Sequence, residues 1–144
     1  MFKVYTAGKM SGLPFEEQME WRRRIEEEIM KLTDAPIQFI HPPLYFRYDL
    51  QLHKSENEVK QWEISQIRDS DIVIVNLDGI NSSVGSHFEL SMIDAVNSFG
   101  NRHIHAIGVG KANEKLHPWI ELTLLRCEEE YAAAAEYIVT YLLI

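Results

Sequence analysis

The sequence contains one cysteine, no excess of basic residues and no apolar run long enough to cross a membrane. The single Cys127 excludes an internal disulfide and offers no zinc cluster, and it favours a reducing compartment. The net charge of −8 argues against an extended nucleic-acid-binding face, which would have to be basic. Because the first residues enter a predicted strand without a signal peptide, we expect a cytoplasmic protein with no membrane attachment.

The length and the hydrophobic content predict one domain spanning residues 1–144. The chain has 144 residues, of which 46% are hydrophobic, and this is enough for a substantial core. The predicted strands are 2–7, 37–40, 72–75, 102–109 and 124–127, and the predicted helices are about 15–32, 56–69, 86–99 and 128–143. This alternation predicts an α/β fold with a doubly wound, mostly parallel five-stranded sheet and helices on both faces, flavodoxin-like or Rossmann-like.

The segment 71–95 is the strongest candidate for a functional site. An uninterrupted β-branched run from Ile72 to Val75 suits a strand that is covered on both faces. A polar loop follows, and then a helix with Glu89 in or near its first turn. Ligands of such sheets bind beyond the carboxyl ends of the strands, so we expect Tyr5, the loop 8–12 and the segment 78–89 to face one crevice.

Glu89 also has a purely structural explanation. Ser86 and Glu89 match the capping-box pattern, in which a serine and a glutamate three residues later satisfy backbone donors at a helix start. A carboxylate that caps its own helix is not free to attack a substrate. On this pattern alone, the capping role and the catalytic role both stay open.

Several other patterns carry less chemistry. The loop Gly8-Lys9-Met10-Ser11-Gly12 is neither a P-loop nor Gly-x-Gly-x-x-Gly, which excludes the usual ATPase and dinucleotide sites. His103 and His105 lack a third ligand and do not predict a metal site. The arginines 22–24 and the neighbouring glutamates are interpreted as a solvent-exposed helix face. Four aromatic residues could either stack on a ligand or pack together: Tyr45, Phe46, Tyr48 and Trp62.

Four short motifs together resemble the nucleoside 2-deoxyribosyltransferase family, including members similar to the 2'-deoxynucleoside 5'-phosphate N-glycosidases. They are Tyr5-Thr6-Ala7-Gly8, Asp71 at the start of the third strand, Asn76-Leu77-Asp78-Gly79 at its end, and Ser83-x-Gly85-x-x-x-Glu89. The resemblance covers most of the chain in order and spacing. It implies cleavage of the N-glycosidic bond of a (deoxy)nucleoside or its 5'-monophosphate, with no metal or organic cofactor.

The resemblance also implies a role for individual residues. Glu89 matches the nucleophile that forms a glycosyl-enzyme intermediate, and Tyr5 matches the tyrosine that orients it. Glu63 stands where the family usually has an aspartate that acts as general acid. At the helix start we expect Glu89 to be ionised, whereas Glu63 should hold its proton. Ser83 replaces the aspartate common in enzymes acting on unphosphorylated nucleosides, and serine beside a helix N-terminus suits a phosphate.

The remaining implied contacts concern the substrate and a partner subunit. The expected substrate-binding residues are Gly8, Lys9, Ser11, Asp78, Gly79, Ser83, Gly85, Ser86, His117 and Trp119. Of these, His117 and Trp119 match a segment that enters the site of a neighbouring subunit, so a homodimer or a higher homo-oligomer is expected. The alternative is a noncatalytic nucleotide-binding or nucleotide-sensing module of the same fold, which Glu63 and the sequence Ser86-His87-Phe88 favour.

Overall fold

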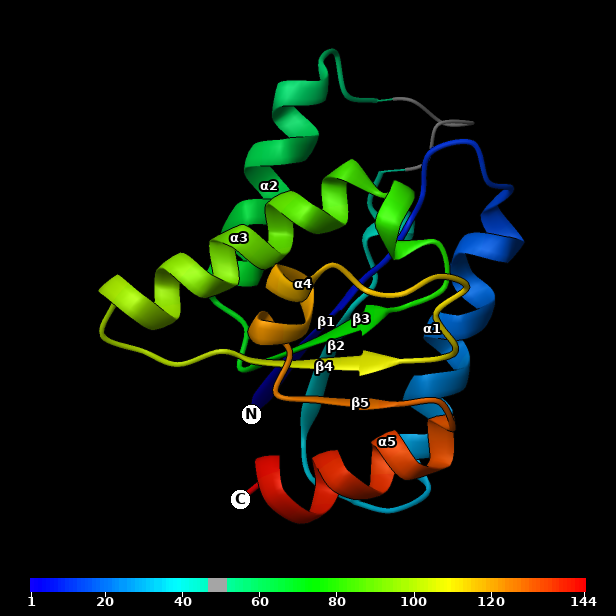
Figure 1. Ribbon diagram of the computed structural model, residues 1–144, viewed down its shortest axis with the longest axis vertical. Coiled ribbons are helices and arrows are strands. Elements are labelled where there is room, and N and C mark those ends of the chain that lie inside the picture. The colour runs from blue at the N-terminus through cyan, green and yellow to red at the C-terminus, as the bar shows by residue number, and fades with distance from the viewer. Residues whose placement is uncertain (47–51) are drawn as a thin grey trace.

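A five-stranded, entirely parallel sheet forms the centre of the computed structural model, which describes residues 1–46 and 52–144 (Figure 1). The strands are β1 (Phe2–Ala7), β2 (Ile37–Ile40), β3 (Ile72–Asn76), β4 (His105–Val109) and β5 (Arg126–Glu128). Their order in the sheet is β2-β1-β3-β4-β5, and all four neighbouring pairs are parallel. This is the doubly wound order whose direction reverses between β1 and β3, where ligands of such folds bind. The predicted fold class is confirmed.

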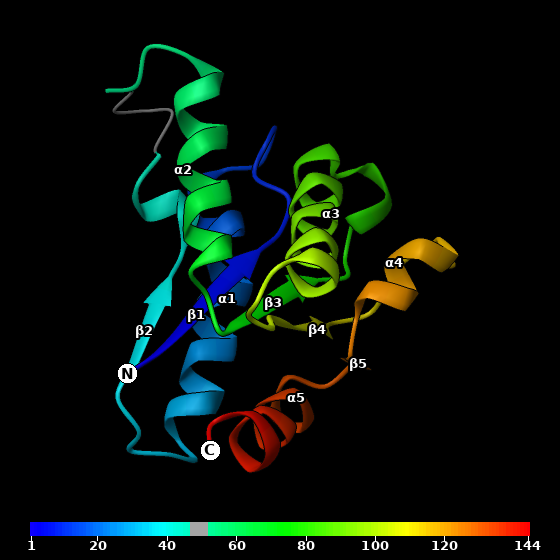
Figure 2. The same ribbon diagram turned by 90° about the vertical axis from the view of Figure 1, so that its left-hand side faces the viewer.

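Helices cover both faces of this sheet (Figure 2). They are α1 (Phe15–Met30), α2 (Glu56–Arg68), α3 (Val84–Phe99), α4 (Pro118–Thr123) and α5 (Tyr131–Tyr137), the last followed by a π-helical turn at Ile138–Leu142. In β3, Ile72 and Ile74 pack towards α1 and α5, whereas Val73 and Val75 pack towards α2 and α3. Both faces of β3 are therefore buried, as its β-branched run predicts.

The ends of several elements differ from the sequence prediction, β5 among them because it begins at Arg126 rather than at 124, and hydrogen bonds explain two of the differences. β4 begins at His105 rather than at 102, because the Asn97 side chain of α3 occupies the backbone hydrogen-bonding groups of Ile104. The Asn97 Oδ1 accepts the Ile104 N–H at 2.7 Å, and the Asn97 Nδ2 donates to the Ile104 carbonyl at 2.8 Å. The last helix begins at Tyr131 rather than at 128, because Glu128 belongs to β5 and its carbonyl accepts the Gly110 N–H at 3.0 Å. The first helix ends at Met30, two residues before the predicted end.

The helix α2 carries a true capping box at its N-terminus. The Ser55 Oγ accepts a hydrogen bond from the Glu58 N–H, and the Glu58 carboxylate accepts one from the Ser55 N–H at 2.7 Å. This reciprocal pair fixes the start of the helix that carries Glu63. Among the described helices, none is both long enough and apolar enough to span a membrane.

Candidate active site

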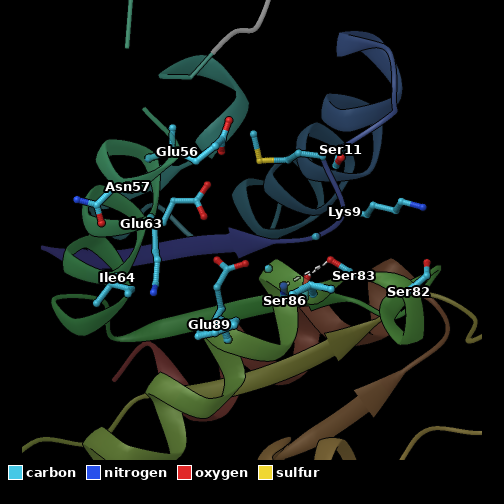
Figure 3. A pocket seen from close by; sticks show the side chains of 17 residues that line it. Lys9, Ser11, Glu56, Asn57, Glu63, Ile64, Ser82, Ser83, Ser86 and Glu89 are labelled. Carbon is cyan, nitrogen blue, oxygen red and sulfur yellow. Dashed lines mark hydrogen bonds between the residues drawn. The ribbon is translucent and has the colours of Figure 1, made fainter. Parts of the chain in front are cut away.

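A cavity of about 810 Å³ opens beside the carboxyl ends of β1 and β3, between α2 and the beginning of α3 (Figure 3). Its size is typical of a small-molecule site. Three segments supply its walls: 8–11 after β1, part of 56–64 on α2, and 82–89 around the start of α3. The cavity brings together eight of the residues expected at a site: Gly8, Lys9, Ser11, Glu63, Ser83, Gly85, Ser86 and Glu89.

The start of α3 excludes the capping role that the sequence left open for Glu89. The helix begins at Val84, so Glu89 lies in its second turn, and the capping residue is Ser83 instead of Ser86. The Ser83 Oγ accepts the Ser86 N–H at 3.4 Å and also pairs with the Ser86 Oγ at 2.8 Å. The Glu89 carboxylate is thus not engaged with the backbone of its own helix start, and it points into the cavity (Figure 3).

Glu63 and Glu89 extend from α2 and α3 into the same part of the cavity (Figure 3). Burial raises the pKa of the Glu89 carboxyl above its usual value, and the nearby Glu63 raises it further. Burial likewise raises the pKa of Glu63, with a smaller contribution from Glu56. Burial therefore works against the ionised state that we expect for Glu89 at the helix start, because desolvation favours the protonated form of a carboxyl. The two acids titrate as a coupled pair around neutral pH.

Tyr5 of β1 is an electrostatic neighbour of both acids, and its side chain is fully buried. Burial and the neighbouring Glu89 raise the pKa of the Tyr5 hydroxyl well above its usual value, so it stays protonated. That hydroxyl favours the charged form of Glu89. The contact is loose, because neither Tyr5 Oη nor Glu89 Oε2 makes a hydrogen bond of ordinary geometry within the described part of the chain.

Sequence reasoning missed one buried cation next to the site. Arg22 was assigned to a solvated helix face, but its side chain has no exposed surface. Its Nε donates to Thr6 Oγ1 at 3.1 Å, and its Nη2 donates to the Gly8 carbonyl at 3.2 Å. The helical spacing indicated that this side chain is buried, because position 22 lies on the same helix face as Ile25 and Ile29. The adjacent Arg23 and Arg24 obscured this pattern.

A second missed residue is Phe88, the aromatic side chain that borders the cavity. It lies on α3 beside Glu89, and Lys60 of α2 places its Nζ 5.0 Å from the ring centroid. The aromatic residues singled out from the sequence pack elsewhere: Trp62 contacts Tyr45 and Phe46, with ring centroids 4.7 and 5.0 Å apart. The fourth, Tyr48, lies outside the described residues.

Besides Tyr5, four expected site residues do not border the cavity. Asp78 and Gly79 line a separate depression on the α1 side of the sheet, where Asp78 Oδ1 accepts a hydrogen bond of 2.5 Å from Asn113. His117 and Trp119 line a hollow between α3 and α4. The His117 Nδ1 caps α4 by accepting the Trp119 N–H at 3.1 Å, and the Trp119 side chain is largely exposed.

The described residues offer no cluster of three or more His, Cys, Asp or Glu side chains that could hold a metal ion. His103 and His105 contact each other edge to face, with ring centroids 4.8 Å apart. Burial lowers the pKa of His105, and the neighbouring His103 lowers it further.

The buried acid pair predicts an unusual dependence of stability on pH. The pKa of each carboxyl is higher in the folded protein than its ordinary value of 4.5, so above that value the unfolded chain releases protons first. The free energy of unfolding should therefore fall as the pH rises through this range. Urea unfolding at about pH 5 and about pH 8 measures this fall, which should be smaller in the double variant Glu63→Gln/Glu89→Gln. Equal falls in both proteins would contradict the raised pKa values.

By sequence, no family model and no curated protein matches the chain. By structure, a 2-deoxyribosyltransferase from Bacillus psychrosaccharolyticus is similar with a TM-score of 0.72 and 12% identity, over 97% of this chain and 95% of that one. A conserved protein from Enterococcus faecalis V583 gives 0.70 and 16%, over 97% and 98%.

A third similar structure is a 2-deoxyribosyltransferase from Leishmania mexicana, with a TM-score of 0.58 and 15% identity, over 98% of this chain and 99% of that one. All three similarities run over nearly the full length of both chains, so they concern the whole fold and not only the central sheet. Identities this low carry the fold and not the individual site residues. The chain therefore has the fold of the 2-deoxyribosyltransferases.

Proposed function

We propose that this protein is an enzyme that cleaves the N-glycosidic bond of a (deoxy)nucleoside or its 5'-monophosphate through a glycosyl intermediate on Glu89. The observation that carries the proposal is a pair of carboxyls, the half-buried Glu63 and the buried Glu89, that share one cavity at the reversal point of the sheet. Glycosidic bonds are commonly cleaved by two carboxyl groups, one as nucleophile and one as acid. The shared fold with 2-deoxyribosyltransferases supports the same chemistry.

In the first step, Glu89 attacks the anomeric carbon of the sugar while the bond from that carbon to the base nitrogen breaks. The electron pair of the broken bond goes to the base, and Glu63 transfers its proton to the base as it departs. The sugar passes through a state with oxocarbenium character, whose positive charge favours the ionised form of Glu89. Because the two acids titrate as a pair, a pair that holds one proton provides both the acid that protonates the base and the carboxylate that attacks the sugar.

In the second step, water or another base attacks the same carbon and releases Glu89. The Glu63 carboxylate, now ionised, accepts the proton of the attacking group. Two inversions give overall retention at the anomeric carbon. The outcome is hydrolysis when water attacks and transfer when a base attacks.

The start of α3 is the proposed site for a 5'-phosphate. Ser83 and Ser86 line the cavity at the helix N-terminus, where backbone N–H groups and the helix dipole favour an anion. Lys9 borders the same region from the β1–α1 loop. A carboxylate at position 83 would repel a phosphate, whereas a serine hydroxyl can donate a hydrogen bond to it.

For the base, we propose the space between α2 and α3 beside Phe88. Lys60 and Glu63 lie one turn apart on α2, and both border the same cavity as Phe88 and Glu89, so the Lys60–Phe88 contact and the acid pair share one cavity. A base leaving the anomeric carbon near Glu89 would therefore meet the Phe88 ring. Aromatic rings bind nucleobases by stacking with little dependence on sequence.

We also propose that the protein works as a homodimer or a higher homo-oligomer. Trp119 and Leu122 of α4 expose 78% and 84% of their surface, which is unusual for such large apolar side chains. In this proposal, His117 and Trp119 act on the site of a neighbouring subunit. Sedimentation velocity tests it, and a monomer at all concentrations would contradict it.

The test of the proposed function is release of free base from a panel of purine and pyrimidine nucleosides and their 5'-monophosphates, in ribo and 2'-deoxy forms. We expect base release from at least one 2'-deoxy compound, and faster loss of substrate when a second free base is supplied if transfer dominates. The alternative, a noncatalytic nucleotide-sensing module, predicts binding by calorimetry without base release. That result would overturn the enzymatic proposal.

A further inference from the structure

The buried guanidinium of Arg22 is bonded to neutral acceptors in the described part of the chain. Besides Thr6 Oγ1 and the Gly8 carbonyl, it donates to the Gln18 carbonyl one turn earlier on α1. No carboxylate lies within ion-pair distance of it among the described residues. A buried cation without a direct partner is costly unless its charge is used nearby.

The guanidinium of Arg22 reaches the wall of the catalytic cavity, because it bonds the carbonyl of Gly8, which borders that cavity together with Glu63 and Glu89. The positive charge of Arg22 lowers the pKa of both carboxyls against the effect of burial. Burial lowers the pKa of Arg22 itself to about 10, so it remains charged at neutral pH. The other charged groups around the pair are Glu56 and Lys60 on α2 and Lys9 on the β1–α1 loop.

On the opposite side, a chain of hydrogen bonds anchors Arg22 to the protein surface. The Thr6 Oγ1 is 2.8 Å from His41 Nδ1, and His41 Nε2 is 2.6 Å from Glu26 Oε2. Burial lowers the pKa of His41, and Arg22 and Arg23 contribute to the same shift. With His41 neutral, Arg22 is the one fully buried positive charge among the described residues.

Arg22 also holds the loop that forms one wall of the cavity. Its Nη2 bonds the Gly8 carbonyl, and the preceding Trp21 packs so closely on Gly8 that an added Cβ would lie 2.6 Å from Trp21 Cζ2. Trp21 and Arg22, two consecutive residues of α1, therefore both contact Gly8, the first residue after β1. Gly8 is also the first residue of the segment 8–11, which borders the cavity.

We propose that Arg22 is a positioning residue whose charge keeps the Glu63–Glu89 pair singly ionised at neutral pH and whose hydrogen bonds fix the cavity wall at Gly8. Arg22 does not touch the substrate in this proposal and acts through the two acids. The inference rests on the proposed function for the catalytic meaning of the pair. The charge relation itself can be measured without turnover.

The experiment is a carboxyl titration by NMR in protein labelled with ¹³C in glutamate, with the signals assigned through Glu63→Gln and Glu89→Gln. In Arg22→Gln, the midpoint of the pair should rise by about one to three pH units, the usual effect of removing a nearby opposite charge. Arg22→Lys keeps the positive charge and loses the several N–H donors of the guanidinium. In this variant, the titration midpoint of the pair should stay near that of the wild type. A midpoint unchanged in Arg22→Gln would overturn the proposal.

A second comparison covers the case in which Arg22→Gln does not fold. Glu63→Gln/Arg22→Gln removes one buried acid together with the cation, and Glu89 should titrate higher in it than in Glu63→Gln alone. Equal midpoints would overturn the proposal. Arg23→Gln, one position along the same helix and exposed, is the matched control and should leave the pair unchanged.

Turnover adds a separate readout. If the wild type releases base, the pH at which kcat/KM rises should move upward in Arg22→Gln and return towards the wild-type value in Arg22→Lys. A merely structural role would lower kcat/KM at every pH without changing the pH at which kcat/KM rises. If the wild type releases no base, the proposed function fails while the titration still decides the role of Arg22.

Discussion

Glu89→Gln should reduce base release by about a thousandfold or more for every nucleoside or nucleotide that the wild type cleaves, as is usual on loss of a nucleophile. The amide cannot form the glycosyl ester, and its neutral oxygen stabilises the oxocarbenium-like state far less than a carboxylate does. The fall should appear mainly in kcat, because the carboxylate acts in the transition state rather than in substrate binding. Base release followed by chromatography measures it.

Folding of this variant should be intact. Glu89 is buried and its pKa is raised, so an uncharged amide of the same shape removes the cost of holding a carboxylate there. We therefore expect the unfolding midpoint in urea at neutral pH to be at least as high as that of the wild type. Glu56→Gln is the matched control, because Glu56 borders the same cavity from an exposed position on α2. It should keep activity within a few fold; full turnover in Glu89→Gln would remove Glu89 as the nucleophile.

Ser83→Asp should lower kcat/KM for a nucleoside 5'-monophosphate about a hundredfold relative to the unphosphorylated nucleoside, since juxtaposed like charges cost several kcal/mol. Ser83 lies at the N-terminus of α3 and borders the cavity, so an aspartate there would face the phosphate. The helix start should survive, because aspartate is as good an N-cap as serine. Competition between the two substrates in one reaction measures the ratio directly.

Ser83→Asn separates the charge from the change in shape. Asparagine has nearly the same size as aspartate, also caps helices well and carries no charge. We expect the phosphate preference to fall much less in this variant than in Ser83→Asp. If Ser83→Asp and the wild type showed the same ratio of the two substrates, Ser83 would not belong to a phosphate site.

The fold was predictable because the patterns that specify it are local. The β-branched run Ile72–Val75 and the helical periods on either side of it determine which segments are strands and which are helices. The helix start at Val84 was harder to predict, because Ser83 and Ser86 both precede a helical period and either serine can act as a cap. Only the observed bond from the Ser86 N–H to Ser83 separates the two.

The residues that form the site were predictable only in part, because this depends on the side of the sheet towards which each loop turns. Residues after β1 and β3 all lie at the carboxyl edge, and this edge has two sides. Asp78 and Gly79 turn towards α1, with Gly79 at a φ of 71°, and the chain then returns to the α2 side at Ser82 and Ser83. No pattern in the sequence specifies that turn.

Arg22 shows the converse limit. A charged residue on a helical stripe of Gln18, Ile25 and Ile29 conflicts with the rule that arginines are exposed, and the rule is usually the safer one. Here the carbonyls of Gln18 and Gly8 and the Thr6 hydroxyl satisfy the guanidinium, so it is buried. Those partners become visible only when β1 and α1 are placed together in space.

The most direct test of the central claim is mass spectrometry of the protein after incubation with a 2-fluorinated deoxynucleoside or its 5'-monophosphate. Fluorine at the 2-position disfavours the oxocarbenium-like state, so both the formation and the hydrolysis of the glycosyl-enzyme intermediate become slower. The intermediate accumulates when its hydrolysis is slowed more than its formation. We expect a mass increase of one glycosyl group, carried by the peptide that contains Glu89 and absent from Glu89→Gln. Base release by the wild type with the adduct on a different residue would contradict it.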